Sequence, residues 1–358
     1  MKIAIDASRY GHKMSTGVEW YSFHIINGII KENDLQKKHQ IILYTKEKLA
    51  IQESPFLKIV YIKNRRLWTL FGLSKRIVKD NLDCLFVPSH TFPLFLPKKR
   101  IITIHDLAFK RYKNAYSFFQ YYYLCFSTWF ASKFATIIIC PSEATKNDLV
   151  KYYNCDEKKI KVVFHGFTAS DTKNRKNNFG DYLFFVGRIE KKKNITLIIK
   201  SFNILKEKWK NLNLVLAGKT GLNYDEISQE IQNSKYRNCI KETGYIDEEN
   251  KNFLYKNAKC FVFPSLYEGF GIPVLEAFYH NCPVVCASSG SLPEVCGDAC
   301  MLVDNVNEKE LANKIDLVLS NNKIKNDLIK KGTRRLKDFS WDMASVKTYE
   351  LLTNNDDK

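Results

Sequence analysis

Short apolar runs alternate with amphipathic stretches along the whole of this 358-residue chain. A parallel β-sheet with helices on both faces produces this alternation, because its strands are buried on both sides and its crossovers are helical. The strand candidates are residues 2–6, 40–45, 59–62, 83–87, 100–104, 136–140, 161–164, 182–186, 212–217, 260–263, 283–286 and 301–303. The helix candidates include 18–31, 194–209, 247–257 and 307–319. The predicted fold class is therefore α/β, with doubly wound, Rossmann-like sheets.

The chain is too long for one ordinary core, and a polar segment divides it. Residues 166–181 are rich in Asn, Lys and Gly and lack hydrophobic periodicity, which is typical of a linker. We expect an N-terminal domain over 1–170, a C-terminal domain over 171–337 and a helix over 338–358. Ligands of doubly wound sheets bind beyond the carboxyl ends of the strands, so functional residues are expected there.

The net charge of +18 is concentrated in the first half of the chain. Residues 1–175 carry 29 lysines and arginines against 14 aspartates and glutamates, whereas residues 176–358 carry 27 against 24. A basic half can indicate an anionic membrane surface or an acidic substrate, and the alternative is a set of solvated lysines. Nucleic acid is disfavoured, because no helix-turn-helix, zinc-finger or RNP pattern accompanies the charge.

Residues 116–130 are densely aromatic and follow a basic segment, residues 110–113. We favour a core helix of the N-terminal domain for this stretch. The alternative is an interfacial surface, in which lysines meet anionic headgroups and aromatic rings enter the interface.

The ten cysteines are scattered, with no C-x-x-C pair and no His/Cys cluster at zinc spacing. We therefore predict reduced thiols and no metal. No apolar stretch is long enough to cross a bilayer, and Asp6 interrupts the N-terminal apolar run, which does not have the design of a signal peptide. The expected location is cytoplasmic, with peripheral attachment at the inner face of the membrane as the variant that the basic half suggests.

The most specific motif is P-S-L-Y-E-G-F-G-I-P-V-L-E, residues 264–276, which follows the apolar run 260–263. Pro273 suits a first helical turn, so Glu268 and Glu276 bracket a turn between a strand end and a helix start. Gly269 and Gly271 allow backbone to approach a ligand closely, and the amides of a helix start favour an anion. The alternative is a tight turn with two solvated glutamates.

Three further candidates stand at strand or helix ends. Arg188 and Lys193 follow the strand 182–186, and a rigid guanidinium with a mobile ammonium suits a diphosphate; the alternative is a solvated basic loop. Gly17 precedes a helix candidate and offers another helix start to an anion. His105 follows the strand 100–104 in T-I-H-D, where the alternative is a structural histidine.

The string 264–276 resembles the P-S-x-x-E-G-F-G-x-P-x-x-E signature of family 4 retaining glycosyltransferases, the E-x7-E group with the GT-B fold. The string G-R-x4-K at 187–193 resembles their diphosphate clamp. The resemblance is strong across 182–303 and loose over the N-terminal half. It implies two Rossmann-like domains facing a central cleft, with the acceptor on the first domain, the nucleotide sugar on the second and the last helix returning to the first.

The resemblance also implies roles for individual residues. Glu268 would hold the sugar, Glu276 the ribose, and the backbone at Tyr245 and Ile246 the base. The implied donor site comprises Gly17, Arg188, Lys193, Tyr245, Ile246, Glu268, Gly269, Phe270, Gly271, Ile272 and Glu276. The implied catalytic residues are Glu268, His105, Arg188 and Lys193. Glu19 stands where the family often has a second glycine, so only Gly17 is carried over from that motif.

The implied reaction is retaining, metal-independent transfer of a hexose from a GDP- or UDP-linked donor, without any other cofactor. The acceptor would be a hydroxyl of a glycan or lipid-linked saccharide in cell-surface polysaccharide synthesis. Mannose is favoured, because T-I-H-D and S-L-P-E-V (residues 291–295) resemble strings of bacterial mannosyltransferases. The alternatives are a sugar phosphorylase or nucleotide-sugar epimerase on the same fold and, less favoured, a non-catalytic basic binding protein.

Overall fold

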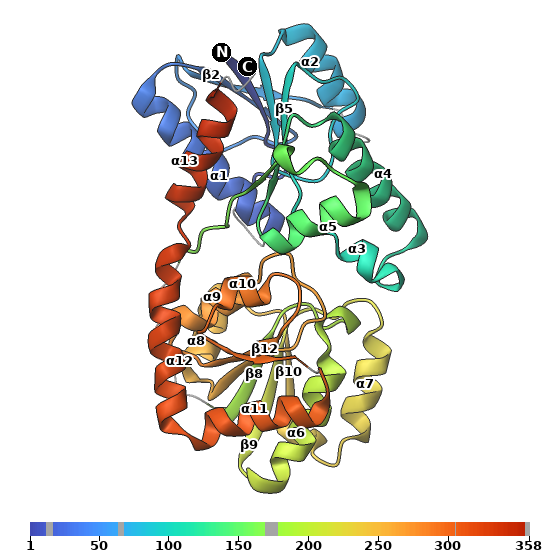
Figure 1. Cartoon of the computed structure of the whole chain (residues 1–358), viewed down its shortest axis with the longest axis vertical. Coiled ribbons are helices and arrows are strands. Elements are labelled where there is room, and N and C mark those ends of the chain that lie inside the picture. Colours follow the sequence, from blue (N-terminus) through green and yellow to red (C-terminus); the bar gives the residue numbers. More distant parts are fainter. Residues whose placement is uncertain (12–16, 64–67, 169–177, 305, 355–358) are drawn as a thin grey trace. The chain divides into compact units, whose positions relative to one another are not determined.

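Two separate parallel sheets organise the chain (Figure 1). The computed structural model describes residues 1–11, 17–63, 68–168, 178–304 and 306–354. Unit 1 comprises Met1–Gly166 with Ser340–Lys358, and unit 2 comprises Phe167–Phe339. The predicted boundary between residues 170 and 171 lies outside the described residues, as does most of the predicted linker 166–181.

In unit 1 the described strands form one parallel sheet in the order β3-β2-β1-β4-β5-β6-β7. These strands are β1 (Lys2–Asp6), β2 (Gln40–Thr45), β3 (Leu57–Tyr61), β4 (Cys84–Val87), β5 (Lys99–Thr103), β6 (Ile137–Cys140) and β7 (Ile160–Val162). The accompanying helices are α1 (Gly17–Gln36), α2 (Ser74–Asp80), α3 (Ala108–Arg111), α4 (Phe118–Phe134), α5 (Glu143–Tyr153) and α13 (Trp341–Thr353).

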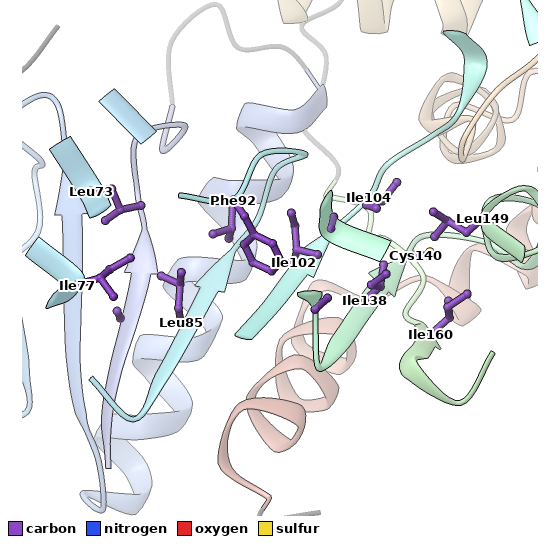
Figure 2. Packing of buried hydrophobic residues seen from close by; sticks show 14 of the residues in the cluster. Leu73, Ile77, Leu85, Phe92, Ile102, Ile104, Ile138, Cys140, Leu149 and Ile160 are labelled. Atoms are coloured by element: carbon purple, nitrogen blue, oxygen red, sulfur yellow. The ribbon is translucent and has the colours of Figure 1, made fainter. Parts of the chain in front are cut away.

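Both faces of this sheet are buried. Successive side chains of a strand point to opposite faces, so neighbouring residues enter different cores. Ala4 of β1 belongs to one hydrophobic core, and its neighbours Ile3 and Ile5 belong to the other. Figure 2 shows part of the first core, where Leu85 and Ile102 extend from neighbouring strands. Helix α13 packs beside α1 over the second core, and Tyr349 donates a hydrogen bond of 3.1 Å to Asn33. The C-terminal helix is therefore part of unit 1.

In unit 2 the described strands form a second parallel sheet in the order β10-β9-β8-β11-β12-β13. They are β8 (Asp181–Val186), β9 (Leu212–Ala217), β10 (Ile240–Gly244), β11 (Cys260–Phe263), β12 (Val284–Ala287) and β13 (Met301–Val303). The helices are α6 (Ile195–Lys208), α7 (Tyr224–Asn233), α8 (Glu248–Asn257), α9 (Ile272–Tyr279), α10 (Leu292–Cys296), α11 (Glu308–Ser320) and α12 (Asn322–Arg335). The predicted class of two Rossmann-like α/β domains is confirmed. All twelve strand candidates coincide with strands to within two residues, and β10 is a strand that the apolar runs did not indicate.

Helix α4 packs on the first core by one side only, so the core helix that we favoured for residues 116–130 is confirmed in part. Its buried side carries Ser127, Thr128, Ala131 and Ser132, while most of its aromatic side chains face outward. We call the exposed set the α4 aromatic face: Phe118, Phe119, Tyr122, Tyr123, Phe126, Trp129 and Phe134. Tyr121 and Phe130 pack against the core, and the aromatic content alone does not reveal which rings lie on that side of the helix. Within the described residues no helix combines the length and apolar character needed to cross a membrane.

Candidate functional site

The loops after β8 and β11 meet at the point where the strand order of unit 2 reverses. Strands β9 and β10 lie to one side of β8, and β11, β12 and β13 lie to the other. In doubly wound sheets the loops that leave such a switch point at the carboxyl ends form the ligand-binding crevice. Arg188 and Lys193 lie in the loop after β8, and Glu268 lies in the loop after β11. Topology therefore places the two strongest motifs of the sequence side by side.

Lys193 and Glu268 form an ion pair across these two loops. Lys193 Nζ lies 2.5 Å from Glu268 Oε1, and the two side chains are only 14% and 13% exposed. Ser265 donates its hydroxyl to the same carboxylate oxygen. The loops are also joined through the backbone, because Leu266 N–H donates to the Lys192 carbonyl at 3.0 Å. The sequence predicts both residues at the site, and in the structure they are partners of one another.

The turn from Ser265 to Gly271, which we call the donor turn, is fixed by its neighbours. Gly271 has φ of +102°, a conformation that a side chain would strain, and it directly precedes α9. A Cβ on Gly290 would lie 2.5 Å from the Glu268 carbonyl oxygen, so only glycine allows this close approach. Ser291 donates its N–H to the Glu268 carbonyl (3.1 Å) and its hydroxyl to the Phe270 carbonyl (2.8 Å).

These contacts define the shape of the donor turn before any ligand binds. Helix α9 begins at Ile272, and the first amides of a helix have no acceptor within it. Gly269, Phe270 and Gly271 thus form the backbone between Glu268 and α9, whose first residue is Ile272. An anion or a polyhydroxylated group can be held here by fixed amides and the Glu268 carboxylate together.

Glu276 is held by a second lysine, Lys251 of α8. Lys251 Nζ lies 2.7 Å from Glu276 Oε1, and Tyr255 donates its hydroxyl to Oε2 at 3.0 Å. Burial alone lowers the pKa of Lys251, but the carboxylates of Glu276 and Glu248 outweigh burial and the pKa is raised. Lys251 therefore stays charged, and it directs Glu276 without the help of a ligand. The sequence did not indicate Lys251, because nothing in its local spacing points to a partner 25 residues away.

Arg188 and Tyr245 are exposed among the other predicted donor residues of unit 2, and Ile246 is half-buried. Arg188 is exposed, and no hydrogen bond or ion pair of its side chain is present among the described residues. Tyr245 is 53% exposed and follows β10, with Lys219 Nζ 4.9 Å from the centre of its ring. Ile246 adjoins it at the same strand end. Lys193 and Arg188, expected to converge on one anion, thus differ: the first is committed to Glu268 and the second is available.

His105 lies in unit 1 at the end of β5 and is 8% exposed. Its Nε2 is 3.0 Å from the Pro88 carbonyl oxygen. A carbonyl can only accept, so Nε2 carries the proton and Nδ1 is the acceptor. Burial, followed by the neighbouring His90, lowers the pKa of His105 to about 4. The side chain is therefore a neutral imidazole that can accept a hydrogen bond from a hydroxyl.

Two neighbours that the sequence did not single out position His105. His90 Nε2 accepts the backbone N–H of His105 at 3.1 Å, and Tyr21 meets the imidazole edge-on with ring centres 4.8 Å apart. Asp106 accepts the N–H of Ala108 at 2.9 Å and so orients the local backbone. The sequence around His90 carries no local signal that it contacts His105. The two loops that hold these histidines meet only in the folded sheet.

Gly17 is the first residue of α1, and a Cβ there would meet nothing within 4 Å. The preceding residues of its motif, Ser15 and Thr16, lie outside the described part of the chain. Glu19 pairs with Arg9 at 3.9 Å. Asp6, at the end of β1 nearby in sequence, is 1% exposed, and burial raises its pKa. Unit 1 therefore has its own set of polar groups at the carboxyl ends of β1 and β5.

Two family models match consecutive parts of the chain. Glycosyltransferase Family 4 matches residues 17–170, and Glycosyl transferases group 1 matches residues 167–335. With two Rossmann-like sheets and a structured switch point in unit 2, these matches define the protein as a glycosyltransferase. The chain belongs to glycosyltransferase family 4 and is similar to its bacterial mannosyltransferases.

Curated relatives carry this similarity at modest identity. O-antigen chain mannosyltransferase B of Escherichia coli is 33% identical over 175 residues, which are 48% of this chain and 46% of that protein. O-antigen chain mannosyltransferase RfbU of Salmonella typhimurium is 26% identical over 317 residues, which cover 85% of this chain and 87% of that protein. The first alignment thus spans about half the length of its relative.

Solved structures share the fold over nearly the whole chain. Sucrose-phosphate synthase of Thermosynechococcus elongatus has a TM-score of 0.76 at 17% identity and covers 98% of both chains. HepE of Anabaena in complex with UDP-glucose has 0.74 at 16%, covering 99% of both. WaaG, a glycosyltransferase involved in lipopolysaccharide biosynthesis, has 0.71 at 12%, covering 99% of this chain and 100% of WaaG. At these identities the likeness is one of fold.

Proposed function

We propose that the chain is a retaining hexosyltransferase that takes its sugar from a GDP- or UDP-linked donor. The acceptor is a hydroxyl of a glycan or lipid-linked saccharide in cell-surface polysaccharide synthesis, and mannose is the favoured sugar. One observation carries the proposal: two nearly buried carboxylates, Glu268 and Glu276, stand at opposite ends of a braced turn at the switch point of unit 2. The O-antigen mannosyltransferases among the relatives support the choice of sugar and pathway class.

The residues divide the donor among them. Glu276, oriented by Lys251, accepts the ribose hydroxyls, and the backbone at Tyr245 and Ile246 faces the base. Glu268 accepts the sugar hydroxyls. Lys193 and Arg188, with the amides of Gly271 and Ile272, receive the diphosphate. In this assignment Glu268 and Glu276, each paired with a lysine, bind different parts of the same donor molecule.

Departure of the diphosphate is the step that needs most stabilisation, because negative charge accumulates on the leaving phosphate. Preorganised cations and amides stabilise such charge without reorganising during the reaction. Arg188 is available for this, and Lys193 can shift from Glu268 to the phosphate when sugar hydroxyls replace it at the carboxylate. Transfer then proceeds on one face of the sugar, with the leaving phosphate accepting the proton of the acceptor hydroxyl. His105 serves as a neutral acceptor for a hydroxyl of the sugar.

A thermal-shift panel of the full chain with UDP, GDP and ADP, and with their sugars, tests the proposal. Ligand at about 100 times Kd adds about 2.7 kcal/mol of stability. We expect either UDP and its sugars or GDP and its sugars to raise the unfolding temperature. Lys193→Ala should abolish the rise. Lys191→Ala is the matched control, because Lys191 pairs with Glu226 on the surface. Absence of a shift with every nucleotide would overturn the proposal.

The reaction itself is checked with the donor that binds. NMR of the glycoside product distinguishes retention from inversion, because the one-bond coupling between C1 and H1 of the transferred sugar identifies its anomeric configuration. Turnover that requires inorganic phosphate and releases a sugar phosphate would instead identify a phosphorylase. Conversion of the donor into another nucleotide sugar, in the absence of an acceptor, would identify an epimerase.

We also propose an anionic membrane surface as a partner of unit 1, bound through the α4 aromatic face. Phe118 and Phe119 are 69% and 85% exposed at the start of α4. Lys110, Lys133 and Lys151 line the same surface groove as Phe126 and Trp129. Exposed rings flanked by lysines match a bilayer interface, where rings enter the headgroup region and lysines meet anionic lipid. This would hold the chain at the inner face of the membrane, near a lipid-linked acceptor.

Vesicle co-sedimentation tests the membrane proposal. We expect binding to phosphatidylglycerol vesicles, weak binding to phosphatidylcholine vesicles, and loss of binding at high salt. Replacing both Phe118 and Phe119 by serine should reduce binding at least tenfold, since burying each ring contributes more than about 1.4 kcal/mol. Tyr61→Ser is the control, because Tyr61 is 55% exposed on β3, away from α4 in sequence and sheet order. Equal binding of both variants would refute the assignment.

A further inference from the structure

Three cysteines of unit 2 come together where β12, α10 and β13 meet. Cys286 lies on β12, Cys296 ends α10, and Cys300 directly precedes β13. Cys286 Sγ is 3.3 Å from Cys300 Sγ and 3.5 Å from Cys296 Sγ. In the described part of the chain, this is the one group of three His, Cys, Asp or Glu side chains whose metal-binding atoms all lie within 4.8 Å of one another.

Backbone structure holds the three sulfurs together. The pairing of β12 with β13 sets Cys286 opposite Leu302, two residues beyond Cys300. Between Cys296 and Cys300 the chain makes a tight turn, in which Ala299 N–H donates to the Cys296 carbonyl at 3.1 Å. The sequence C-G-D-A-C thus folds back so that both sulfurs face β12. Its C-x3-C spacing falls within the range used by zinc sites. The prediction of no metal from the sequence missed this spacing.

The cluster consists of three separate thiols. The sulfur separations exceed a disulfide bond of about 2.05 Å, and all ten cysteines are free. Arg335 donates to the carbonyls of Val295 (3.0 Å) and Glu294 (2.6 Å), the two residues before Cys296, and it pairs with Asp338 at 2.6 Å.

We propose that Cys286, Cys296 and Cys300 form a binding site for one thiophilic d10 metal ion, with Cu(I) as the best match. Thiolate ligands select Cu(I) and Zn(II) among biological metals. Metal–sulfur bonds of about 2.3 Å place three sulfurs about 3.8–4.0 Å apart, so Cys286 must move away from Cys296 and from Cys300 by only about half an ångström. Three sulfurs complete the shell of Cu(I), whereas Zn(II) requires a fourth donor.

Binding releases the thiol protons to solvent, and no change in oxidation state is involved. Each of the three S–H groups loses its proton as its sulfur bonds to the ion. The ion would join β12, α10 and the start of β13. Because Ser291 directly precedes α10, the same short segment connects the metal site with the donor turn. The proposed glycosyl transfer does not depend on this site.

The test uses the full chain, reduced and stripped of metal, titrated anaerobically with Cu(I) against a chromophoric Cu(I) chelator. We expect one equivalent bound, with sulfur-to-copper charge-transfer absorption in the near ultraviolet, and a rise in unfolding temperature. Zn(II), titrated against its own chelator, should bind at least tenfold more weakly than Cu(I).

Cys296→Ala should lose the bound ion and its absorption. Cys282→Ala should keep both, because Cys282 is an equally buried thiol of unit 2 outside the cluster. Cys300→Ala gives a second variant, and far-ultraviolet circular dichroism of each metal-free variant establishes that it is folded. Equal Cu(I) binding by folded Cys296→Ala and by the unaltered chain would overturn the proposal. So would failure of the unaltered chain to compete with the chelator, or a mass two hydrogens lower that shows a disulfide in the reduced protein.

Discussion

Replacing Lys193 by methionine should destabilise unit 2 markedly, because it leaves the Glu268 carboxylate charged and nearly buried. The two groups are 2.5 Å apart, with 14% and 13% of their side chains exposed. Removing one partner of a fully buried ion pair costs about 3–5 kcal/mol. The residual exposure and the hydroxyl of Ser265, which donates to Glu268, reduce this figure, and we expect about 2–3 kcal/mol.

The double variant Lys193→Met/Glu268→Gln distinguishes lost charge pairing from lost packing. With neither charge present, the protein should regain about 1–2 kcal/mol relative to Lys193→Met alone. Trp209 is the one tryptophan between residues 167 and 339. Fluorotryptophan labelling therefore allows ¹⁹F NMR to follow urea unfolding of unit 2 separately.

Lys191→Met is the control for this cycle, since Lys191 and Glu226 form an exposed pair, and the expected change is below about 0.5 kcal/mol. Two results would refute the reasoning. One is a Lys193→Met variant as stable as the control. The other is a double variant whose loss equals the sum of the two single losses.

Three other substitutions have expected outcomes. Lys251→Ala should weaken nucleotide binding about tenfold by calorimetry, because Glu276 loses the cation that directs it. Ser291→Ala should destabilise the protein by about 1–2 kcal/mol and speed hydrogen exchange in the donor turn, since the Phe270 carbonyl loses its buried donor. His105→Gln should reduce the decrease in unfolding free energy that occurs as the pH is lowered. The unfolded chain takes up this proton near pH 6.5 and the folded chain only near pH 4, so stability falls as pH is lowered through that window. The contribution of His105 is at most about 1.4 kcal/mol per pH unit in urea unfolding.

The strands could be predicted from sequence because parallel strands are buried on both faces and read as continuous apolar runs. Strand β10 escaped for the same reason, since it lies at the sheet edge and its Lys241 and Glu242 are exposed. Helix α4 was predicted only in part, because composition alone cannot orient a helix. Its Ser, Thr and Ala side chains pack inward closely, and the larger aromatic rings are left outside.

The candidate site was predictable where its residues share one loop. The donor turn, Glu268 and Glu276 are contiguous in sequence, and a turn of this kind carries its own signal. Lys251, His90 and the cysteine cluster are not contiguous with their partners. Their contacts arise from sheet order, strand register and helix packing, which bring separate elements together, and these contacts are not encoded in local spacing. The pairing of Lys193 with Glu268 belongs to the same class: the two residues were predicted, and their contact was not.

That pairing has a consequence for affinity. A bare nucleoside diphosphate that binds Lys193 must displace the Glu268 carboxylate, which would be left nearly buried with Ser265 as its remaining donor. A nucleotide sugar that binds Lys193 also brings hydroxyls that donate to Glu268 and compensate for the lost cation. We therefore expect the sugar-bearing donor to bind more tightly than the bare diphosphate, by about 1–2 kcal/mol or roughly tenfold.

Glu268→Gln should reverse this order of affinities. An amide does not need a cation, so Lys193 becomes available to phosphate and the diphosphate should bind more tightly than it does to the unaltered chain. Because the sugar hydroxyls then have no charge to satisfy, the advantage of the sugar-bearing donor should shrink to less than about twofold. Calorimetry of both ligands with both proteins measures the four affinities. If Glu268→Gln weakens the bare diphosphate, then Glu268 assists phosphate binding and does not compete for Lys193, and the exchange between carboxylate and phosphate at this lysine is ruled out.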